Sequence, residues 1–118
     1  MNKRLKKVLA LALGAALTVT SLTACGSGSK KSSAKYNIGI CQLVQHEALD
    51  AATKGFEDAL KEKLGDDVKF DEQNAQGDSA TCATIVNSFV SSNVDLILAN
   101  ATAPLQAAAN ATEDIPIL

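Results

Sequence analysis

The sequence has little of the residue types on which several classes of protein depend. Its 118 residues include one His, three Cys, no Trp and four aromatic residues, one Tyr and three Phe. One His and three Cys are too few for a zinc finger or a disulfide-rich domain. Four aromatic residues also leave little for stacking nucleic-acid bases. Because 47% of the residues are hydrophobic, the chain can still build a core, and this excludes simple disorder.

Charge is distributed unevenly along the chain. The net charge is −2, yet residues 1–24 contain four basic residues and no acidic residue. The 94 residues that follow carry 7 basic against 13 acidic residues, a net charge of −6. No basic cluster lies beyond residue 35, which argues against nucleic-acid binding. Residues 1–24 are therefore a different kind of sequence from the rest.

The N-terminal segment has the pattern of an export signal. A basic stretch, 1–7, precedes an apolar stretch, 8–19, that is shorter than the roughly 20 residues needed to span a bilayer. Leu22-Thr-Ala-Cys25 resembles the lipobox of bacterial lipoproteins, which implies cleavage before Cys25 and lipidation (diacylglyceryl, palmitate) of its thiol. We predict a lipoprotein signal peptide over 1–24 and a flexible tether over 25–35, and expect an extracytoplasmic, lipid-anchored protein at the cell membrane.

From residue 36 onward, hydrophobic patterns of strand and helix alternate. The predicted strands are 36–44, 68–73, 94–99 and a fourth from 115; the predicted helices are 47–64, a second beginning near 79, and 102–112. Short connections and right-handed crossovers make this an α/β fold, a doubly wound parallel sheet with helices on both faces. The third strand is the most apolar, so we expect it to be central.

Local signals refine the helices. The first helix should bury a stripe and end at Gly65, with Glu57–Lys61 as an ion pair on its solvated face. The second should begin at an N-cap, Asp78 or Ser79, and Thr102 is the candidate N-cap of the third. The apolar stripes are Leu49, Ala52, Phe56, Ala59, Leu60 and Leu64 in the first helix, and Cys82, Ile85, Val86, Phe89 and Val90 in the second.

A set of motifs over 36–118 resembles the ABC-transporter substrate-binding proteins of the tryptophan/tyrosine-transport type. The matching segments are 36–52, 55–60, 74–78, 94–99, 101–103, 106–110 and 114–117. The resemblance implies the first lobe of a two-lobed periplasmic-binding-protein (type I) fold. Since the sequence stops inside the predicted fourth strand, we expect 36–118 to be a partial N-terminal lobe of a longer protein, incomplete at the C-terminus.

The resemblance also implies a function. Such a protein is a receptor, not an enzyme, that binds a small molecule between its lobes and delivers it to an ABC permease; an aromatic amino acid is the first candidate ligand. It needs no cofactor and no metal. Two alternatives stay open, a sugar or nucleoside receptor of the same fold and a surface enzyme. A single His without an acidic partner at a recognisable spacing argues against the enzyme.

Ligands of parallel sheets bind at the carboxyl ends of the strands, so the loops there hold the candidate ligand-binding residues. Helix N-termini suit a carboxylate, and uncharged side chains can orient a ligand. Gln42 could instead bond to backbone, Thr102 could only cap its helix, and His46 could be an ordinary surface residue. The candidates are Gln42, Gln45, His46, Gln76, Asn100, Ala101 and Thr102.

Two further cysteines have two interpretations. If the strand order is 2-1-3-4, the helix that carries Cys82 crosses the first strand, which carries Cys41. The two sulfurs could then approach each other and form a disulfide, which an exported protein can keep. The simpler interpretation is a pair of buried small hydrophobic residues. This interpretation is favoured because few pairs of cysteines meet the strict geometry of a disulfide.

Overall fold

The computed structural model describes residues 34–118; the predicted signal peptide, Cys25 and nearly all of the tether lie outside this range. The described part contains a parallel sheet with the strand order β2-β1-β3. Its elements are β1 (Tyr36–Gln42), α2 (Glu47–Leu64), a short 3-10 turn η1 (Gly65–Asp67), β2 (Val68–Asn74), α3 (Ser79–Ser91), β3 (Leu96–Asn100) and α4 (Thr102–Ala111).

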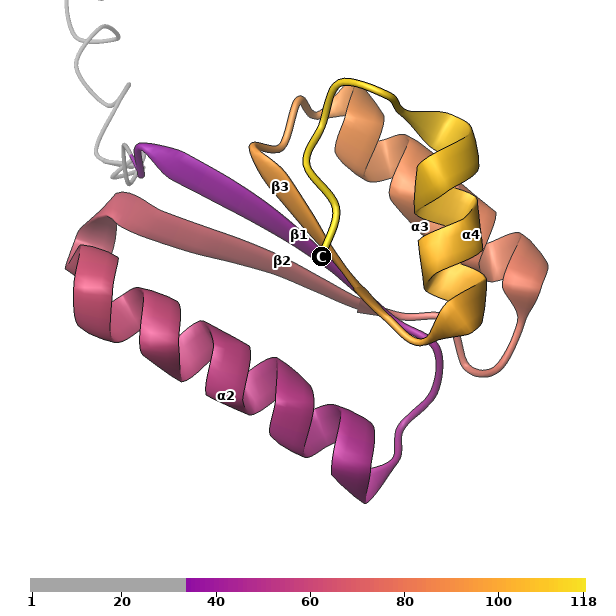
Figure 1. The fold of residues 1–118 in the computed structure, drawn as a ribbon, viewed down its shortest axis with the longest axis horizontal. Helices are drawn as coiled ribbons and strands as arrows, with labels where there is room; N and C mark the ends of the chain where they lie inside the picture. Colours follow the sequence, from indigo (N-terminus) through magenta and orange to yellow (C-terminus); the bar gives the residue numbers. More distant parts are fainter. Residues whose placement is uncertain (1–33) are drawn as a thin grey trace, which may run out of the picture. The chain divides into compact units, whose positions relative to one another are not determined.

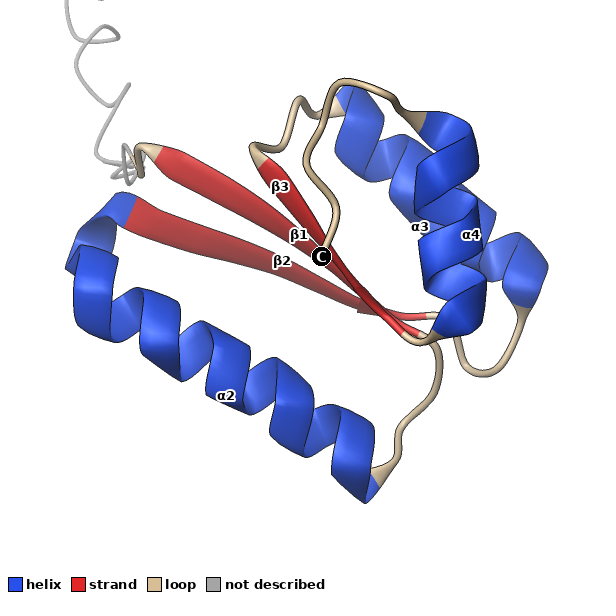
Figure 2. Ribbon diagram, in the orientation of Figure 1, coloured by secondary structure: helices blue, strands red, loops and turns tan. Residues whose placement is uncertain are grey.

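Helices cover both faces of this sheet, as expected for a doubly wound fold. α2 lies on one side of the strands, and α3 and α4 lie together on the other (Figures 1 and 2). The predicted α/β class is therefore confirmed. No helix within residues 34–118 is long and apolar enough to cross a membrane.

The third strand begins two residues later than predicted. β1 lies between β2 and β3, and its last five residues are all buried. β3 has β1 on one side and the segment of Ile117 on the other, so its predicted central place is confirmed. Asp95, predicted inside the third strand, lies just before β3: its carboxylate accepts a hydrogen bond from the Asn37 N–H at 2.7 Å, and its own N–H donates to the Asn37 carbonyl. β1 also ends at Gln42, two residues early.

The predicted fourth strand is present as a single parallel bridge between Ile97 and Ile117. Ile97 donates its N–H to the Pro116 carbonyl at 2.9 Å, and Ala99 donates to the Leu118 carbonyl at 2.8 Å. The segment thus runs along β3, on the edge that β1 does not occupy. This placement corresponds to the strand order 2-1-3-4.

Local capping signals predicted two of the three helices correctly. α2 spans the predicted residues and is followed by Gly65 at φ 56°, which donates its N–H to the Lys61 carbonyl. Asp78 caps α3 by accepting the Thr81 N–H at 2.8 Å. The side-chain hydrogen bond from Thr81 also lowers the pKa of the Asp78 carboxyl, and the backbone hydrogen bond from Thr81 has a smaller effect in the same direction. The predicted N-cap of α4 was wrong: Thr102 is the first helical residue and Ala101 precedes it, without a side-chain cap.

The core lies mainly between the sheet and α3. Cys82, Val86 and Phe89 of the predicted stripe are buried, and Ile85 and Val90 pack beside them. The stripe of α2 is correct only in part, because Ala52 and Ala59 are exposed while Thr53 is buried.

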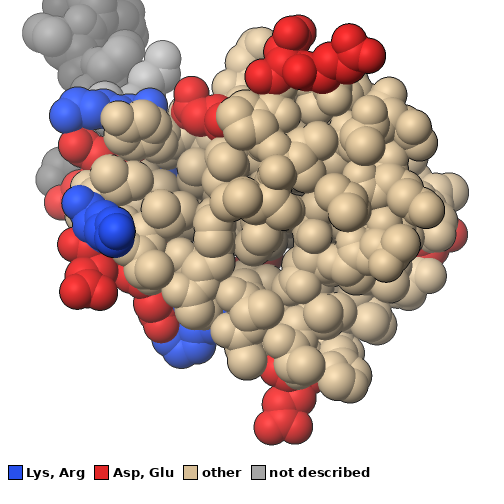
Figure 3. Space-filling view, in the orientation of Figure 1, with Lys and Arg blue, Asp and Glu red and all other residues tan. Residues whose placement is uncertain are grey.

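Charged side chains concentrate on the α2 side of the molecule, whereas most of the surface over α3 and α4 is uncharged (Figure 3). Neither α3 nor α4 contains a Lys, Arg, Asp or Glu. On α2, the predicted Lys61–Glu57 pair forms at 2.9 Å, and Lys61 also lies 5.1 Å from the centre of the Phe70 ring. Lys61 therefore joins α2 to β2 as well as facing solvent.

Candidate functional site

The carboxyl ends of the three strands form a row of amide side chains. In the strand register, Gln42 at the end of β1 lies opposite Asn74 of β2 on one side and Asn100 of β3 on the other. The chain leaves each strand here through a short loop that leads into a helix. This edge is the place where ligands bind in open parallel α/β sheets.

The Gln42 side chain is buried and fully engaged within the protein. Its Nε2 donates to the Asp50 carboxylate at 2.6 Å and to the Val44 carbonyl at 3.0 Å. Its Oε1 accepts from the Thr53 hydroxyl at 2.8 Å. Because both ends of its amide already have partners, Gln42 holds α2 against the end of β1, where it acts as a positioning residue.

Asn100 belongs to the same network. Its Nδ2 donates to the Leu49 carbonyl at 2.9 Å and to the Thr53 hydroxyl at 3.0 Å, with a longer contact of 3.4 Å to Gln42 Oε1. These bonds connect β3 to α2 across β1. Within residues 34–118, no buried side-chain nitrogen or oxygen lacks a hydrogen-bond partner.

The loop after β1 presents Gln45 and His46 to solvent. His46 also caps α2, because its Nδ1 accepts a hydrogen bond from the Ala48 N–H at 3.2 Å. Sequence patterns predicted the position of His46 at this edge but not the cap. An exposed ring that is held by its own cap has a restricted orientation, which suits contact with a ligand.

The loop after β2 is shaped by Asn74. Its Oδ1 accepts the Gln76 N–H at 2.8 Å, and Gln76 itself adopts the left-handed region at φ 53°. The next residue, Gly77, donates its N–H to the Leu43 carbonyl at 2.7 Å, which ties this loop to the loop after β1. The Gln76 side chain is exposed at the same edge as Gln45.

The third loop is a single residue, Ala101, with φ 127° and ψ 173°. Residues other than glycine rarely adopt this conformation, and such strain is found mostly at functional positions. The turn lets α4 begin directly at the end of β3, so the N–H groups of its first turn lie at the carboxyl edge of the sheet. Thr102, exposed in that turn, adds a hydroxyl.

Relief of this strain should be measurable. Glycine adopts a φ near that of Ala101 without steric cost, so Ala101→Gly should raise the free energy of unfolding by about 1 kcal/mol. Ala103→Gly, two residues later at an ordinary helical position, should instead lower it by about 0.5–1 kcal/mol. Urea unfolding of both variants tests this; an equal loss at both positions would contradict a strained Ala101.

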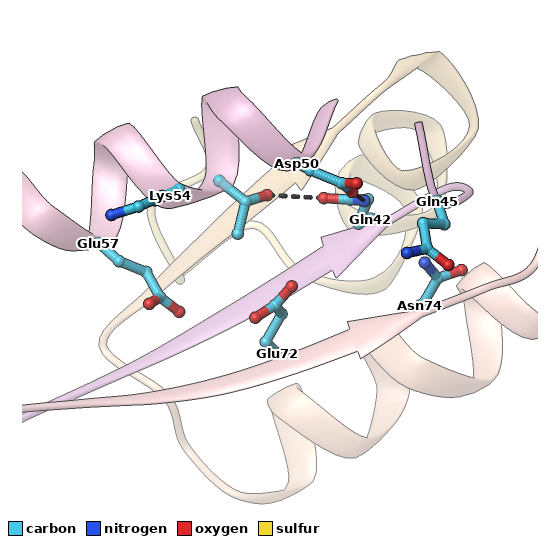
Figure 4. A pocket seen from close by; sticks show the side chains of 8 residues that line it. Gln42, Gln45, Asp50, Lys54, Glu57, Glu72 and Asn74 are labelled. Carbon is cyan, nitrogen blue, oxygen red and sulfur yellow. Dashed lines mark hydrogen bonds between the residues drawn. The ribbon is translucent and has the colours of Figure 1, made fainter. Parts of the chain in front are cut away.

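A pocket of about 410 Å³ opens between α2 and the strands β1 and β2 (Figure 4). The carboxylates of Glu57, from α2, and Glu72, from β2, point into the gap, and Gln45 and Asn74 approach each other at one end. Of the predicted residues, Gln42 and Gln45 line this pocket; the other five do not. The remaining lining residues are Asp50, Thr53, Lys54, Glu57, Glu72 and Asn74.

Sequence reasoning missed two residues that shape the edge, Asp50 and Asn74. Asn74 could have been found, because it aligns with Gln42 and Asn100 as the last polar residue of its strand. Asp50 looked like part of the solvated face of α2, and only the fold brings it to Gln42. No group of three or more His, Cys, Asp or Glu within residues 34–118 could hold a metal ion.

Comparison with known proteins gives this edge its context. The family model of ABC transporter substrate binding proteins matches residues 37–118. The chain belongs to this family. Proteins of the family are substrate-binding receptors that act outside the cytoplasm. The match confirms the predicted family. Similar solved structures confirm the fold.

Several relatives within the family are similar to this chain. A tyrosine-binding protein from Clostridioides difficile (strain R20291) is 46% identical over 126 aligned positions, which cover 96% of this chain and 36% of that protein. A ligand-free, open substrate-binding protein with adhesive properties from Clostridium difficile is 49% identical, with a TM-score of 0.67 over 70% of this chain and 29% of the other.

A third relative was solved with a ligand. The ABC domain from Streptococcus pneumonia in complex with L-Trp is 38% identical, with a TM-score of 0.65 over 70% of this chain and 28% of that structure. The chain thus spans about a third of the length of the relatives it matches.

Proposed function

We propose that this chain forms part of the N-terminal lobe of a lipid-anchored, extracytoplasmic receptor that binds an aromatic amino acid for an ABC importer. The observation that supports this most directly is the carboxyl edge of the sheet, where three loops and the start of α4 meet. The tyrosine-binding relative and the relative in complex with L-Trp point to the same class of ligand. A receptor of this kind binds and releases its ligand without covalent chemistry.

The edge offers two kinds of contact to an amino acid. The free N–H groups at the start of α4 suit its carboxylate, because a helix N-terminus attracts negative charge, and the Thr102 hydroxyl adds a donor. Gln45, His46 and Gln76 are exposed on the neighbouring loops and suit the ammonium and the side chain. Gln42 and Asn100 hold the strand ends in place behind them.

The remainder of the site would come from a second lobe that closes over this edge, since an edge of exposed loops encloses a ligand on one side only. Hinge closure of two lobes around a ligand is a common mode of binding. Export would proceed through the signal peptide at 1–24, and two acyl chains on Cys25 would keep the protein at the membrane beside the permease. The tether, 25–35, would let the lobes move.

Thermal-shift screening of the mature protein tests the ligand class. L-Tyr, L-Trp or L-Phe at about 100 times its Kd should raise the midpoint of unfolding by about 5 °C or more, because a ligand that binds the folded state stabilises it by mass action. Sugars and nucleosides should give no shift. A shift with sugars alone would replace the proposal with the sugar-receptor alternative.

Thr102→Val provides a matched variant at the edge. It removes a hydroxyl from an exposed side chain while keeping its shape, so it should weaken binding of the amino acid about tenfold with little change in stability. Thr84→Val, an exposed threonine on α3, should leave the affinity unchanged. Equal affinities for the two variants, measured by calorimetry, would remove Thr102 from the site.

A further inference from the structure

The described chain contains two cysteines, and both are completely buried in one cluster. Cys41 lies on β1 and Cys82 on α3, each with 0% of its surface exposed. Both are free thiols within the same apolar cluster, between the sheet and α3. A pair of thiols in a small core can be more than a packing feature if the two sulfurs face each other.

The packing of β1 on α3 places them opposite each other. Gly39 lies against the Phe89 ring, and Cys41 points to the same face of the sheet, about 7 Å further along the strand. α3 starts at the carboxyl edge and runs back towards the amino edge, so Cys82, two turns before Phe89, lies about 10 Å along the helix in the same direction. The two side chains therefore lie close to each other, towards the carboxyl ends of the strands.

The chemistry of Cys41 reflects this contact. Burial raises the pKa of its thiol to about 12, and the neighbouring Cys82 thiol adds to the shift through its charge and a hydrogen bond. A thiolate is the attacking species in disulfide exchange, so the folded, protonated pair reacts slowly. Oxidation of this pair should therefore take place during folding, before α3 packs on β1 and buries both thiols.

We propose that Cys41 and Cys82 form a disulfide that joins β1 to α3 when this segment folds in an oxidising compartment outside the cytoplasm. The two thiols lose two protons and two electrons as the sulfur–sulfur bond forms. A small disulfide, such as glutathione disulfide, accepts the electrons and leaves as two thiols. The reaction proceeds by exchange through a mixed disulfide.

The disulfide would stabilise the carboxyl edge of the sheet, where the proposed ligand site lies. Cys41 directly precedes Gln42, which holds α2 and β3 at the end of β1, and Cys82 lies in the first turn of α3, next to the loop of Asn74 and Gln76. Joining them ties that loop to the middle strand. Because the core shields the bond, reductants should reach it only after unfolding.

Peptide mapping of the full chain provides the test. The protein is unfolded, refolded with glutathione and its disulfide, alkylated without reduction, and digested with trypsin. Cys41 lies on the tryptic peptide 36–54 and Cys82 on the peptide that begins at residue 70. We expect these two peptides to be joined, with a mass about 2 Da below their sum because two hydrogens are lost, and to separate after reduction. Two alkylated, separate peptides would overturn the proposal.

Two variants make the result specific. Cys25→Ala removes the third thiol and should leave the link in place, whereas Cys82→Ala should abolish it. The oxidised protein should unfold about 10 °C or more above the reduced one, because the bond closes a long loop in the unfolded chain. A link from Cys25 to either residue would also refute the pairing. Amino-acid binding plays no part in these readings, so they stand apart from the proposed function.

Discussion

Replacing Gly39 with alanine should lower the free energy of unfolding by about 2–3 kcal/mol, because it overpacks the core. A Cβ on Gly39 would lie 2.6 Å from two carbon atoms of the Phe89 ring and 3.0 Å from a third. Phe89 is itself buried, with 1% of its surface exposed, so a shift of its ring would disturb the surrounding core. Urea unfolding of the two proteins measures the loss.

Gly55→Ala is the matched control for this substitution. Gly55 lies within α2, and apart from its chain neighbours and the backbone of its own helix no atom lies within 4 Å of the place that a Cβ would occupy, so alanine there gains helix propensity without a clash. This variant should be more stable than the parent by about 0.5–1 kcal/mol. The same chemical change should thus have opposite signs at the two positions.

A double variant identifies the cause of the loss at Gly39. Phe89→Leu alone removes ring atoms from the core and destabilises the protein, but it also makes room for a Cβ at residue 39. In Gly39→Ala/Phe89→Leu, the total loss should therefore be smaller than the sum of the two single losses, by about 1 kcal/mol or more. Strict additivity would mean that the clash with Phe89 is not the reason.

Replacing Gln42 with leucine should cost about 2 kcal/mol of stability, because it removes hydrogen bonds from the buried Thr53 and from Asp50. The Thr53 hydroxyl, with only 3% of its residue exposed, loses its acceptor, and the Asp50 carboxylate loses a hydrogen bond of 2.6 Å. Leucine is close to glutamine in size, so the loss reports hydrogen bonding more than volume. Chemical denaturation gives the value.

Gln73→Leu makes the same replacement on the exposed surface of β2. Gln73 donates one hydrogen bond to Asp71 in solvent, so leucine there should change stability by less than about 0.5 kcal/mol. If the two glutamine variants lose equal stability, the hydrogen bonds of the buried Gln42 add no more to the free energy of unfolding than an exposed hydrogen bond does.

The network should also matter for ligand binding under the proposed function. Gln42 and Asn100 hold the ends of β1 and β3, from which His46 and Thr102 follow within a few residues. Gln42→Leu should therefore weaken amino-acid binding as well as stability, although its own amide is turned inward. A variant with full affinity would show that the strand ends keep their positions without the network.

Much of the architecture could be predicted from local sequence patterns. The helix over 47–64, its end at Gly65 and the Asp78 cap of α3 depend on contacts between residues a few positions apart, which periodicity and capping rules describe directly. The boundaries that failed lie where distant segments meet. Asp95 lies outside β3 and forms a hydrogen bond with Asn37, 58 residues earlier in the chain. Ala101, not Thr102, is the N-cap residue of α4.

The sequence by itself therefore determined the order of strands and helices, the doubly wound class, the family and the edge of the sheet where the polar residues gather. Only the tertiary structure decided which of those residues face inward. Gln42, Thr53 and Asn100 are separated by 11 to 58 positions along the chain, yet their side chains satisfy one another. A hydrogen bond between side chains requires both groups to be positioned to within a fraction of an ångström, which periodicity does not encode. The same reason applies to Cys41 and Cys82, whose contact exists only once α3 packs on β1.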